Sequence, residues 1–170
     1  MTQNKIDRSK GNWFKAEEWE TLSEGLPVYR GFSRPLAEDM NHIAPPTDRK
    51  PKNIPMAAHR IIDQWFLDRF GFNFRTRALF GSGSTQKAIA HAEGGEIGLI
   101  RPAADFMFCW SPHSYDLFGE YAQLESDEQI PELLERLEFT VENLDQAIRS
   151  GHEIMLASEA FIAEKVRYII

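Results

Sequence analysis

FNFRTRALFGSGS, residues 72–84, has the pattern of a β-strand that runs into a turn of small residues. Aromatic residues alternate at its start and an apolar run follows, which predicts a strand over Phe72–Ser82. The small residues then lead into a short helix over Thr85–Glu93, with Ser84 or Thr85 as the N-cap. Because this turn brings backbone amides and hydroxyl groups to a helix N-terminus, the segment indicates both a local fold and a candidate site.

Further strand-like stretches lie on both sides of this segment. β-Branched and aromatic residues favour strands over residues 28–32, 96–101, 106–111, 153–156 and 160–169. The spacing of 96–101 and 106–111 suggests that these two strands pair across a turn at Pro102.

Apolar residues at helical spacing predict longer helices over residues 13–22, 54–70 and 126–150. The last of these helices is acidic on its outer side. Between residues 33 and 55, five prolines and few large apolar residues indicate a loop or lid. Helices near the front and strands throughout favour an α+β fold with a largely antiparallel sheet.

The length and composition fit one globular domain. A chain of 170 residues with 42% hydrophobic content can close one core and is short for two. Residues 1–12 are polar, so we expect a flexible N-terminus followed by a single domain over 13–170. The formal net charge of -7 argues against nucleic acid as a main partner. The sequence leaves the oligomeric state open.

Targeting and metal signals are missing from the pattern. The N-terminus lacks the apolar stretch of a secretory signal, and no run approaches bilayer-spanning length. Cys109 is the one cysteine and lies among large apolar residues, which indicates a buried thiol in a reducing compartment. The five histidines have no metal-ligand spacing. We therefore expect a cytoplasmic protein with no membrane segment and no metal.

Arg30 lies in the middle of the expected strand 28–32. An arginine on a strand often lays its aliphatic stem on the sheet as a surface residue, which is one interpretation of this position. The other is anion recognition, since a planar guanidinium binds a phosphate through two hydrogen bonds. Gly31 beside it would let a ligand approach the backbone closely.

The Gly81–Ser84 turn also has two interpretations. It is either an ordinary turn with an N-cap, or a site where amides and hydroxyl groups surround a polar ligand. It lacks the lysine of a nucleoside-triphosphate loop and the glycine spacing of a Rossmann turn. A hydrolase triad of Ser84 with His113 and Asp116 is a weaker alternative, because the nucleophile-elbow pattern is missing.

Glu153 begins an apolar strand directly after a glycine and a histidine. A carboxylate at this point is either a solvated end residue or a positioned acid that holds a sugar hydroxyl and supports a positively charged transition state. His152 would point to the opposite face of a regular strand, so it is not an obvious partner. Aromatic packing in the core or in a lid is the simpler interpretation of Trp110, Tyr115, Phe118 and Tyr121.

The order of these segments is informative. Tyr29-Arg30-Gly31, Phe80-Gly81-Ser82-Gly83-Ser84 and Glu153-Ile154-Met155-Leu156 resemble the three motifs of the arginine-serine-glutamate class of mono-ADP-ribosyltransferases. The resemblance implies an ADP-ribosyltransferase-like fold, with a split, mostly antiparallel β core and flanking helices. It also implies that NAD is the substrate and lies in a cleft of this core.

The resemblance assigns a role to each motif. Arg30 would hold an NAD phosphate, Ser82 would organise the nicotinamide side, and Glu153 would bind the ribose hydroxyl and stabilise an oxocarbenium-like state. Further contacts to NAD would come from Gly31, Phe80, Ser84 and Trp110. One aromatic ring would face the nicotinamide, from Phe80, Trp110 or Tyr115.

The chain departs from this class at two positions. Gly83 replaces the usual threonine, and Gly151 stands where members that modify arginine carry a second glutamate. The second departure leaves the acceptor residue open. Residues 112–150 are a long insertion before Glu153, which either positions the target or completes the core.

The resemblance therefore implies transfer of ADP-ribose from NAD to a macromolecule, with a protein as acceptor, by a toxin-like effector of phage or bacterial type. Two alternatives remain. The same site would serve an NAD glycohydrolase without an acceptor. In a non-enzymatic binding module or inhibitor, the acidic helix 126–150 would be the docking face.

Overall fold

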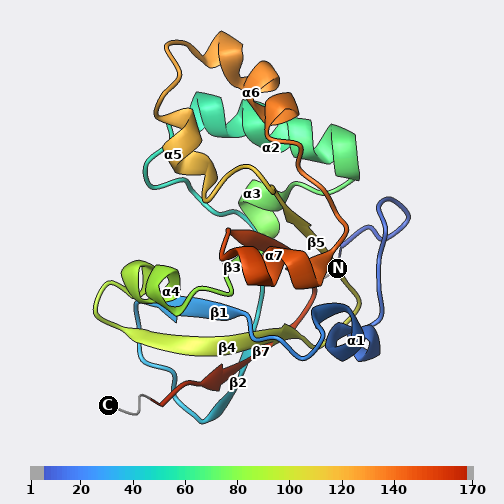
Figure 1. Cartoon of the computed structure of the whole chain (residues 1–170), viewed down its shortest axis with the longest axis vertical. Helices are drawn as coiled ribbons and strands as arrows, with labels where there is room; N and C mark the ends of the chain where they lie inside the picture. Colours follow the sequence, from blue (N-terminus) through green and yellow to red (C-terminus); the bar gives the residue numbers. More distant parts are fainter. Residues whose placement is uncertain (1–5, 168–170) are drawn as a thin grey trace.

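The computed structural model describes residues 6–167, whose strands form two antiparallel sheets (Figure 1). One sheet has the order β1 (Tyr29–Phe32), β4 (Glu96–Pro102), β7 (Phe161–Lys165) and β2 (Met40–Ile43). The other has the order β3 (Leu79–Gly81), β6 (Ile154–Ser158) and β5 (Phe106–Trp110). The expected α+β fold with antiparallel sheets is confirmed.

The predicted pairing between the strands at 96–101 and 106–111 is wrong. β4 pairs with β1 on one side and β7 on the other, so both of its edges are occupied. The chain therefore leaves this sheet after Pro102, and β5 pairs with β6 instead. The return crossing, from β6 to β7, runs beside it, where the Ala103 amide donates to the Ala160 carbonyl at 2.8 Å. These two crossings connect the sheets.

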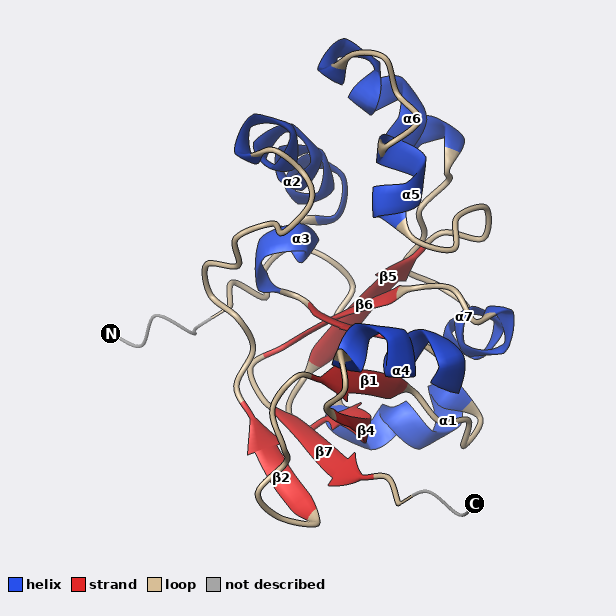
Figure 2. Ribbon diagram, turned by 90° about the vertical axis from the view of Figure 1, so that its left-hand side faces the viewer, coloured by secondary structure: helices blue, strands red, loops and turns tan. Residues whose placement is uncertain are grey.

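Helices cover both sheets, and three of them gather at one end of the molecule. α2, α5 and α6 lie together beyond the second sheet, whereas α4 lies against β1 (Figure 2). The helical elements are η1 (Ala16–Glu18), α1 (Trp19–Ser23), α2 (Met56–Phe70), α3 (Phe74–Arg77), α4 (Thr85–Ala92), α5 (Leu117–Tyr121), η2 (Asp127–Gln129), α6 (Ile130–Arg136) and α7 (Leu144–Ser150).

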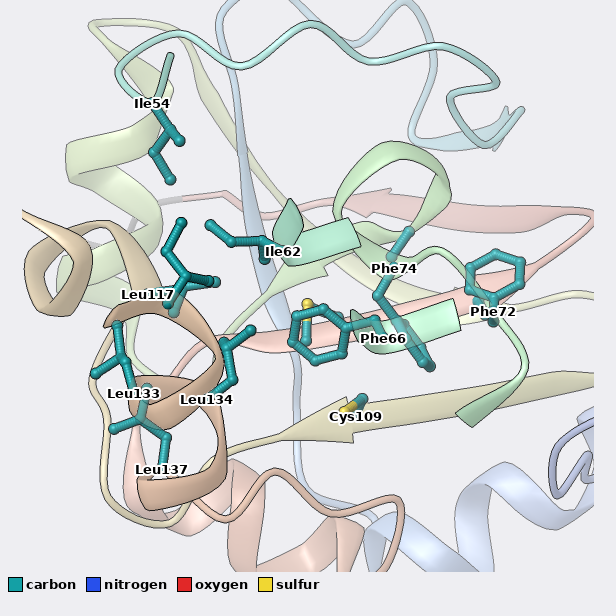
Figure 3. Packing of buried hydrophobic residues seen from close by; sticks show 14 of the residues in the cluster. Ile54, Ile62, Phe66, Phe72, Phe74, Cys109, Leu117, Leu133, Leu134 and Leu137 are labelled. Atoms are coloured by element: carbon teal, nitrogen blue, oxygen red, sulfur yellow. The ribbon is translucent and has the colours of Figure 1, made fainter. Parts of the chain in front are cut away.

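Two apolar clusters meet at the second sheet, because β5 is buried on both of its faces. Met107 and Cys109 point into one cluster, with side chains of α2, α3 and α6 (Figure 3). Phe106, Phe108 and Trp110 alternate with them and point into the other cluster, which fills the space between the sheets. Burial of each such side chain contributes about 1.5–3 kcal/mol, so this sheet is the centre of the core.

Cys109 is fully buried, as expected from its neighbours. Burial raises the pKa of its thiol, because the thiolate would lose its hydration.

No helix within residues 6–167 is both long and apolar enough to span a bilayer.

The predicted strand over Phe72–Ser82 is half wrong. Only Leu79–Gly81 forms a strand, and Phe74–Arg77 forms the short helix α3. The carboxylate of Asp63, on α2, accepts hydrogen bonds from the backbone amides of Arg75 and Thr76 at 3.0 and 3.3 Å. This contact from a neighbouring helix stabilises a helical turn that the local sequence does not favour.

The predicted helix 126–150 is also wrong as a single element. Its first part forms η2 and α6, its last part forms α7, and an extended segment separates them. Thr140 in this segment pairs with Trp110 in both directions, at 2.9 and 3.0 Å. Glu138 and Asn143 have positive φ angles of 51° and 64°, which end one helix and precede the next. The apolar side of α6 packs against α2, so this helix contributes to the core.

Part of the proline-rich segment is more ordered than the sequence suggests. The proline-rich stretch 33–55 contains β2, which pairs with β7 before the loop 44–55 begins. Of the N-terminal residues 1–12, the first five lie outside the described residues. Ile6 is buried, and its amide donates to Glu159 at 3.2 Å, whereas residues 7–12 are exposed.

The remaining predicted elements agree with the structure to within a few residues at each end. Helix α4 begins at its predicted N-cap, where the Ser84 hydroxyl oxygen accepts from the Lys87 amide at 3.2 Å. The predicted strand 160–169 ends at Lys165, and Tyr168 and Ile169 lie outside the described residues.

Candidate functional site

Backbone pairing brings the three candidate segments together. Tyr29 and Ser82 exchange two hydrogen bonds, at 2.7 and 2.9 Å, so the Arg30 strand lies beside the serine turn. One residue earlier in that turn, Gly81 pairs with Ile154, which follows Glu153 directly. Arg30, Ser82 and Glu153 consequently line one pocket.

The pocket has a volume of about 390 Å³, within the range of small-molecule sites. Its walls come from β1, β3, α3, α4 and the loop 44–55. The cations lining it outnumber the carboxylates, although the chain as a whole is acidic. The cations are Arg30, Arg49, Lys50, Lys52, Arg75 and Lys87, and the carboxylates are Asp116 and Glu153. This charge distribution favours an anionic ligand.

Arg30 is held inside the pocket by the strand next to its own. Its Nη1 donates to the carbonyl oxygen of Phe80 at 2.8 Å, and its guanidinium lies 5.5 Å from the Phe32 ring centre. Burial lowers the pKa of Arg30, and the charge of Glu153 opposes this effect. Among the described residues, Nε of Arg30 is buried and has no hydrogen-bond partner. Such a cation gains from an anion that enters the pocket.

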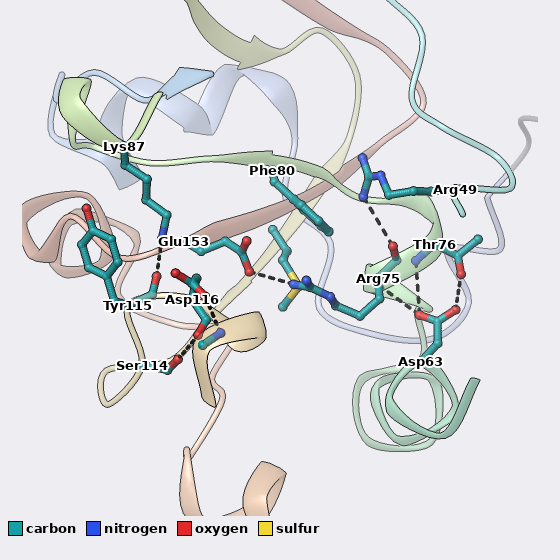
Figure 4. A network of polar contacts seen from close by, with 12 residues as sticks. Arg49, Asp63, Arg75, Thr76, Phe80, Lys87, Ser114, Tyr115, Asp116 and Glu153 are labelled. Carbon is teal, nitrogen blue, oxygen red and sulfur yellow. Dashed lines mark hydrogen bonds and ion pairs between the residues drawn. The ribbon is translucent and has the colours of Figure 1, made fainter. Parts of the chain in front are cut away.

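Glu153 forms an ion pair with Arg75 (Figure 4). Nη1 of Arg75 lies 2.7 Å from Oε1 of Glu153, and the two side chains are only 11% and 15% exposed. The backbone amide of Glu153 donates to the carbonyl of Tyr115 at 3.0 Å. Sequence reasoning missed Arg75, because the residue lies on α3, where a strand was predicted.

Arg49 comes from the loop 44–55 and reaches the same place. Its guanidinium lies 4.1 Å from the Phe80 ring centre, and that of Arg75 lies 4.5 Å from it. Burial, together with the charges of Arg30 and Arg75, lowers the pKa of Arg49 to about 10. The Phe80 ring therefore contacts Arg49 and Arg75, and the Phe80 carbonyl accepts from Arg30. No signal in the sequence linked Arg49 to this site.

Lys87 and Asp116 line the side of the pocket next to Glu153. Nζ of Lys87, on α4, donates to the carbonyl of Tyr115 and lies 3.9 Å from that ring's centre. Burial lowers the pKa of Lys87, whereas Glu153 and Asp116 raise it. Asp116 caps α5, since its Oδ1 accepts from the Gly119 amide at 2.7 Å.

Ser82 holds the chain just before Glu153. It is 2% exposed, and its hydroxyl donates to the carbonyl of Gly151 at 2.8 Å. The same oxygen accepts from the Ser84 amide at 3.0 Å. Ser82 thus links the serine turn to the segment that carries Glu153.

Gly31 lines the pocket, and both Gly31 and Gly83 also allow close packing of the chain. A Cβ atom on Gly31 would lie 2.2 Å from the carbonyl oxygen of Ala88, on α4. A Cβ atom on Gly83 would lie 2.1 Å from that of Ile148, on α7. The glycine at position 83 therefore leaves room for α7.

Two further candidates lie away from the ligand space. Trp110 does not line the pocket, since its Nε1 donates to the carbonyl of Glu142 at 2.8 Å and its ring packs between the sheets. Ser84 caps α4, and His113 pairs with Glu138 at 3.1 Å, so neither joins Asp116 in a hydrolase triad. Of the three aromatic candidates for the nicotinamide ring, only Phe80 lines the pocket.

Nδ1 of His152 donates to the carbonyl oxygen of Ser111, 2.8 Å away, and within the described region His152 makes no hydrogen bond to Glu153. Nowhere between residues 6 and 167 do three or more histidine, cysteine or acidic side chains gather as a metal site. No protein-family model, curated protein or solved structure matches the chain.

Proposed function

We propose that this protein binds NAD in the pocket of Arg30, Ser82 and Glu153 and transfers its ADP-ribose to an acceptor, releasing nicotinamide. The observation that carries this proposal is the convergence of these three residues, from distant segments, on one cationic pocket. Each of them has another explanation when taken alone. Their shared position, in the order of the motifs that they resemble, supports a common role.

The charges of the pocket suit the parts of NAD. The diphosphate is anionic, and Arg30 and Arg49 offer guanidinium groups that bind phosphate oxygens in a bidentate manner. Phe80 offers an aromatic ring for the nicotinamide. Glu153 is the carboxylate that accompanies these groups on the strand side of the pocket.

The reaction that fits this arrangement breaks the bond between the ribose C1′ and the nicotinamide nitrogen. Nicotinamide leaves with the electron pair, and positive charge develops on the ribose. The Glu153 carboxylate stabilises this charge, which raises the rate because the interaction is strongest in the transition state. A nucleophile of the acceptor then bonds to C1′ and loses its proton. We propose an intracellular protein as the acceptor, with water as the alternative.

Gly151 bears on the acceptor. It has a φ angle of 73°, a conformation that disfavours a glutamate side chain. A second carboxylate two residues before Glu153 would therefore strain the chain. We infer that the acceptor is selected by other residues than a glutamate pair.

The test is release of nicotinamide from NAD by the parent protein and by Glu153→Gln and Arg30→Ala. Glu138→Gln is the matched control, because Glu138 is exposed and lies outside the pocket. We expect release by the parent and the control, and a loss of at least about 100-fold in Glu153→Gln.

The acceptor is tested with labelled NAD and a cell extract. Labelled protein would support the transferase, whereas release without labelling would favour the glycohydrolase. If the parent releases no nicotinamide and labels no protein, both enzymatic functions are wrong.

A further inference from the structure

We propose that Arg75 is a positioning residue for Glu153: it fixes the carboxylate in the orientation that the reaction needs. This inference rests on the proposed function. It starts from the ion pair between Nη1 of Arg75 and Oε1 of Glu153, at 2.7 Å. One such hydrogen bond leaves most of the carboxylate's acceptor capacity for a ligand, since a carboxylate has about four lone-pair positions.

The guanidinium of Arg75 is itself restrained by its neighbours. It lies 4.5 Å from the Phe80 ring centre, and its Nη1 also lies 3.5 Å from the sulfur of Met155. The Arg75 side chain is 11% exposed. An arginine held in this way sets the position of its partner rather than following it.

The backbone of Arg75 is fixed from the other side. Asp63 accepts from the amides of Arg75 and Thr76, and also from the Thr76 hydroxyl. Nε2 of His59 lies 3.0 Å from the same hydroxyl oxygen. These contacts connect α2 to α3, and through Arg75 they reach Glu153 (Figure 4). The helix α3 is thereby anchored to α2, and it places Arg75 next to Glu153.

The arginines of the pocket differ in whether they pair with a carboxylate, and their roles follow from this difference. Arg75 already pairs with a carboxylate and is nearly buried, whereas Arg30 and Arg49 have no carboxylate partner at salt-bridge distance among residues 6–167. We therefore assign binding of the ligand's phosphates to Arg30 and Arg49, and orientation of Glu153 to Arg75. A residue that acts through Glu153 should lose its effect when Glu153 no longer carries the reaction.

The experiment compares Arg75→Met and Arg75→Lys in the parent and in Glu153→Gln. It measures kcat and KM for nicotinamide release, and the Kd of NAD by calorimetry. In the parent, we expect Arg75→Met to lower kcat by about 100-fold with less than about threefold change in KM, since small displacements of a catalytic group have effects of this size. The kcat of Arg75→Lys should be about tenfold higher than that of Arg75→Met. In Glu153→Gln, Arg75→Met should change the remaining rate by less than about twofold.

Arg69→Met is the matched control, because Arg69 also pairs with a carboxylate at 2.7 Å, that of Glu135, but lies on the surface. It should leave kcat unchanged. Equal losses from Arg75→Met in both backgrounds, or a loss confined to KM and Kd, would overturn the inference and leave the proposed function standing. If Arg75→Met does not fold, the same comparison with Arg75→Lys decides. A parent protein that releases no nicotinamide would overturn both this inference and the proposed function.

Discussion

Tyr29 and Ser82 exchange two backbone hydrogen bonds, at 2.7 and 2.9 Å, and so link β1 of one sheet to the residue that follows β3 of the other. This short seam lies at the pocket and connects β1 to the end of β3. Next to these two residues, α4 packs on Gly31 and α7 packs on Gly83. The position of Arg30 relative to Glu153 therefore depends on two close approaches of backbone to backbone.

The first prediction concerns these two glycines. Gly31→Ala and Gly83→Ala place a Cβ atom 2.2 and 2.1 Å from carbonyl oxygens, and those oxygens belong to helices that must move. We expect each substitution to lower the free energy of unfolding by about 2–3 kcal/mol, measured by urea denaturation. Gly119→Ala is the control, because its nearest neighbour is a side-chain oxygen at 3.3 Å. Stabilities equal to that of the control would show that the helices can shift freely.

The sequence predicts several local elements well. Helix α2, helix α4 with its Ser84 cap, and strands β1, β4, β5 and β6 follow from apolar spacing and capping residues. Pairing does not follow, because it depends on which strand edges are free in three dimensions. The strands at 96–101 and 106–111 illustrate this, since β4 is already flanked on both sides.

The site divides in the same way. Arg30, Ser82 and Glu153 stand next to recognisable turns and strand starts, so a sequence motif can contain them. Arg75 enters the pocket only because Asp63, on another helix, stabilises α3. Arg49 enters because a loop without a regular sequence pattern lines the pocket. Such contacts depend on the tertiary structure, so residue spacing does not predict them.

The second prediction concerns the stability of the Arg75–Glu153 pair in the absence of ligand. Glu153→Gln leaves Arg75 without its partner, and it removes a charge that also acts on Arg30 and Arg49. We expect a loss of about 3 kcal/mol, as for other buried pairs that lose one partner. Arg75→Met should cost less, because it relieves repulsion among the cations.

A double-mutant cycle checks this prediction by urea denaturation. The double variant should be more stable than the sum of the single losses predicts, with a coupling of at least about 1 kcal/mol. Losses that add to within about 0.5 kcal/mol would mean that the two side chains do not interact energetically.

The third prediction concerns pH and His59. Burial is the main cause that lowers the pKa of His59 from 6.5, while Asp63 opposes it. The unfolded chain therefore binds a proton more readily than the folded protein does. Stability from the neutral imidazole is present above about pH 6.5 and is lost as the pH falls below it, through the lower pKa of the folded state.

Thermal unfolding at pH 7.5 and 5.0 tests this effect. The drop in Tm between these two values should be smaller in His59→Gln than in the parent, because glutamine does not titrate but can still donate to Thr76. His42→Gln, at an exposed position of β2, should behave as the parent does. An equal drop in all three proteins would contradict the assignment.

The fourth prediction concerns Arg49 as a ligand for phosphate. In the ligand-free protein this cation is unfavourable, because burial and the charges of Arg30 and Arg75 lower its pKa to about 10. Below this pKa Arg49 is still charged in the folded protein, so the cost of burying its charge is fully present at neutral pH. Its contacts with Phe80 and with the Arg75 carbonyl, at 3.4 Å, hold it in the pocket all the same. A charged residue whose burial destabilises the fold is expected to serve ligand binding.

Arg49→Ala should therefore affect binding and stability in opposite directions. We expect the Kd of ADP, measured by calorimetry, to rise about 10- to 100-fold, since a charge-assisted hydrogen bond contributes about 1.5–3 kcal/mol. The Tm at neutral pH should not fall. Arg34→Ala is the control, because Arg34 is exposed and does not line the pocket. An unchanged Kd would exclude Arg49 from the phosphate site. A lower Tm together with a higher Kd would mean that Arg49 supports the pocket only through packing on Phe80.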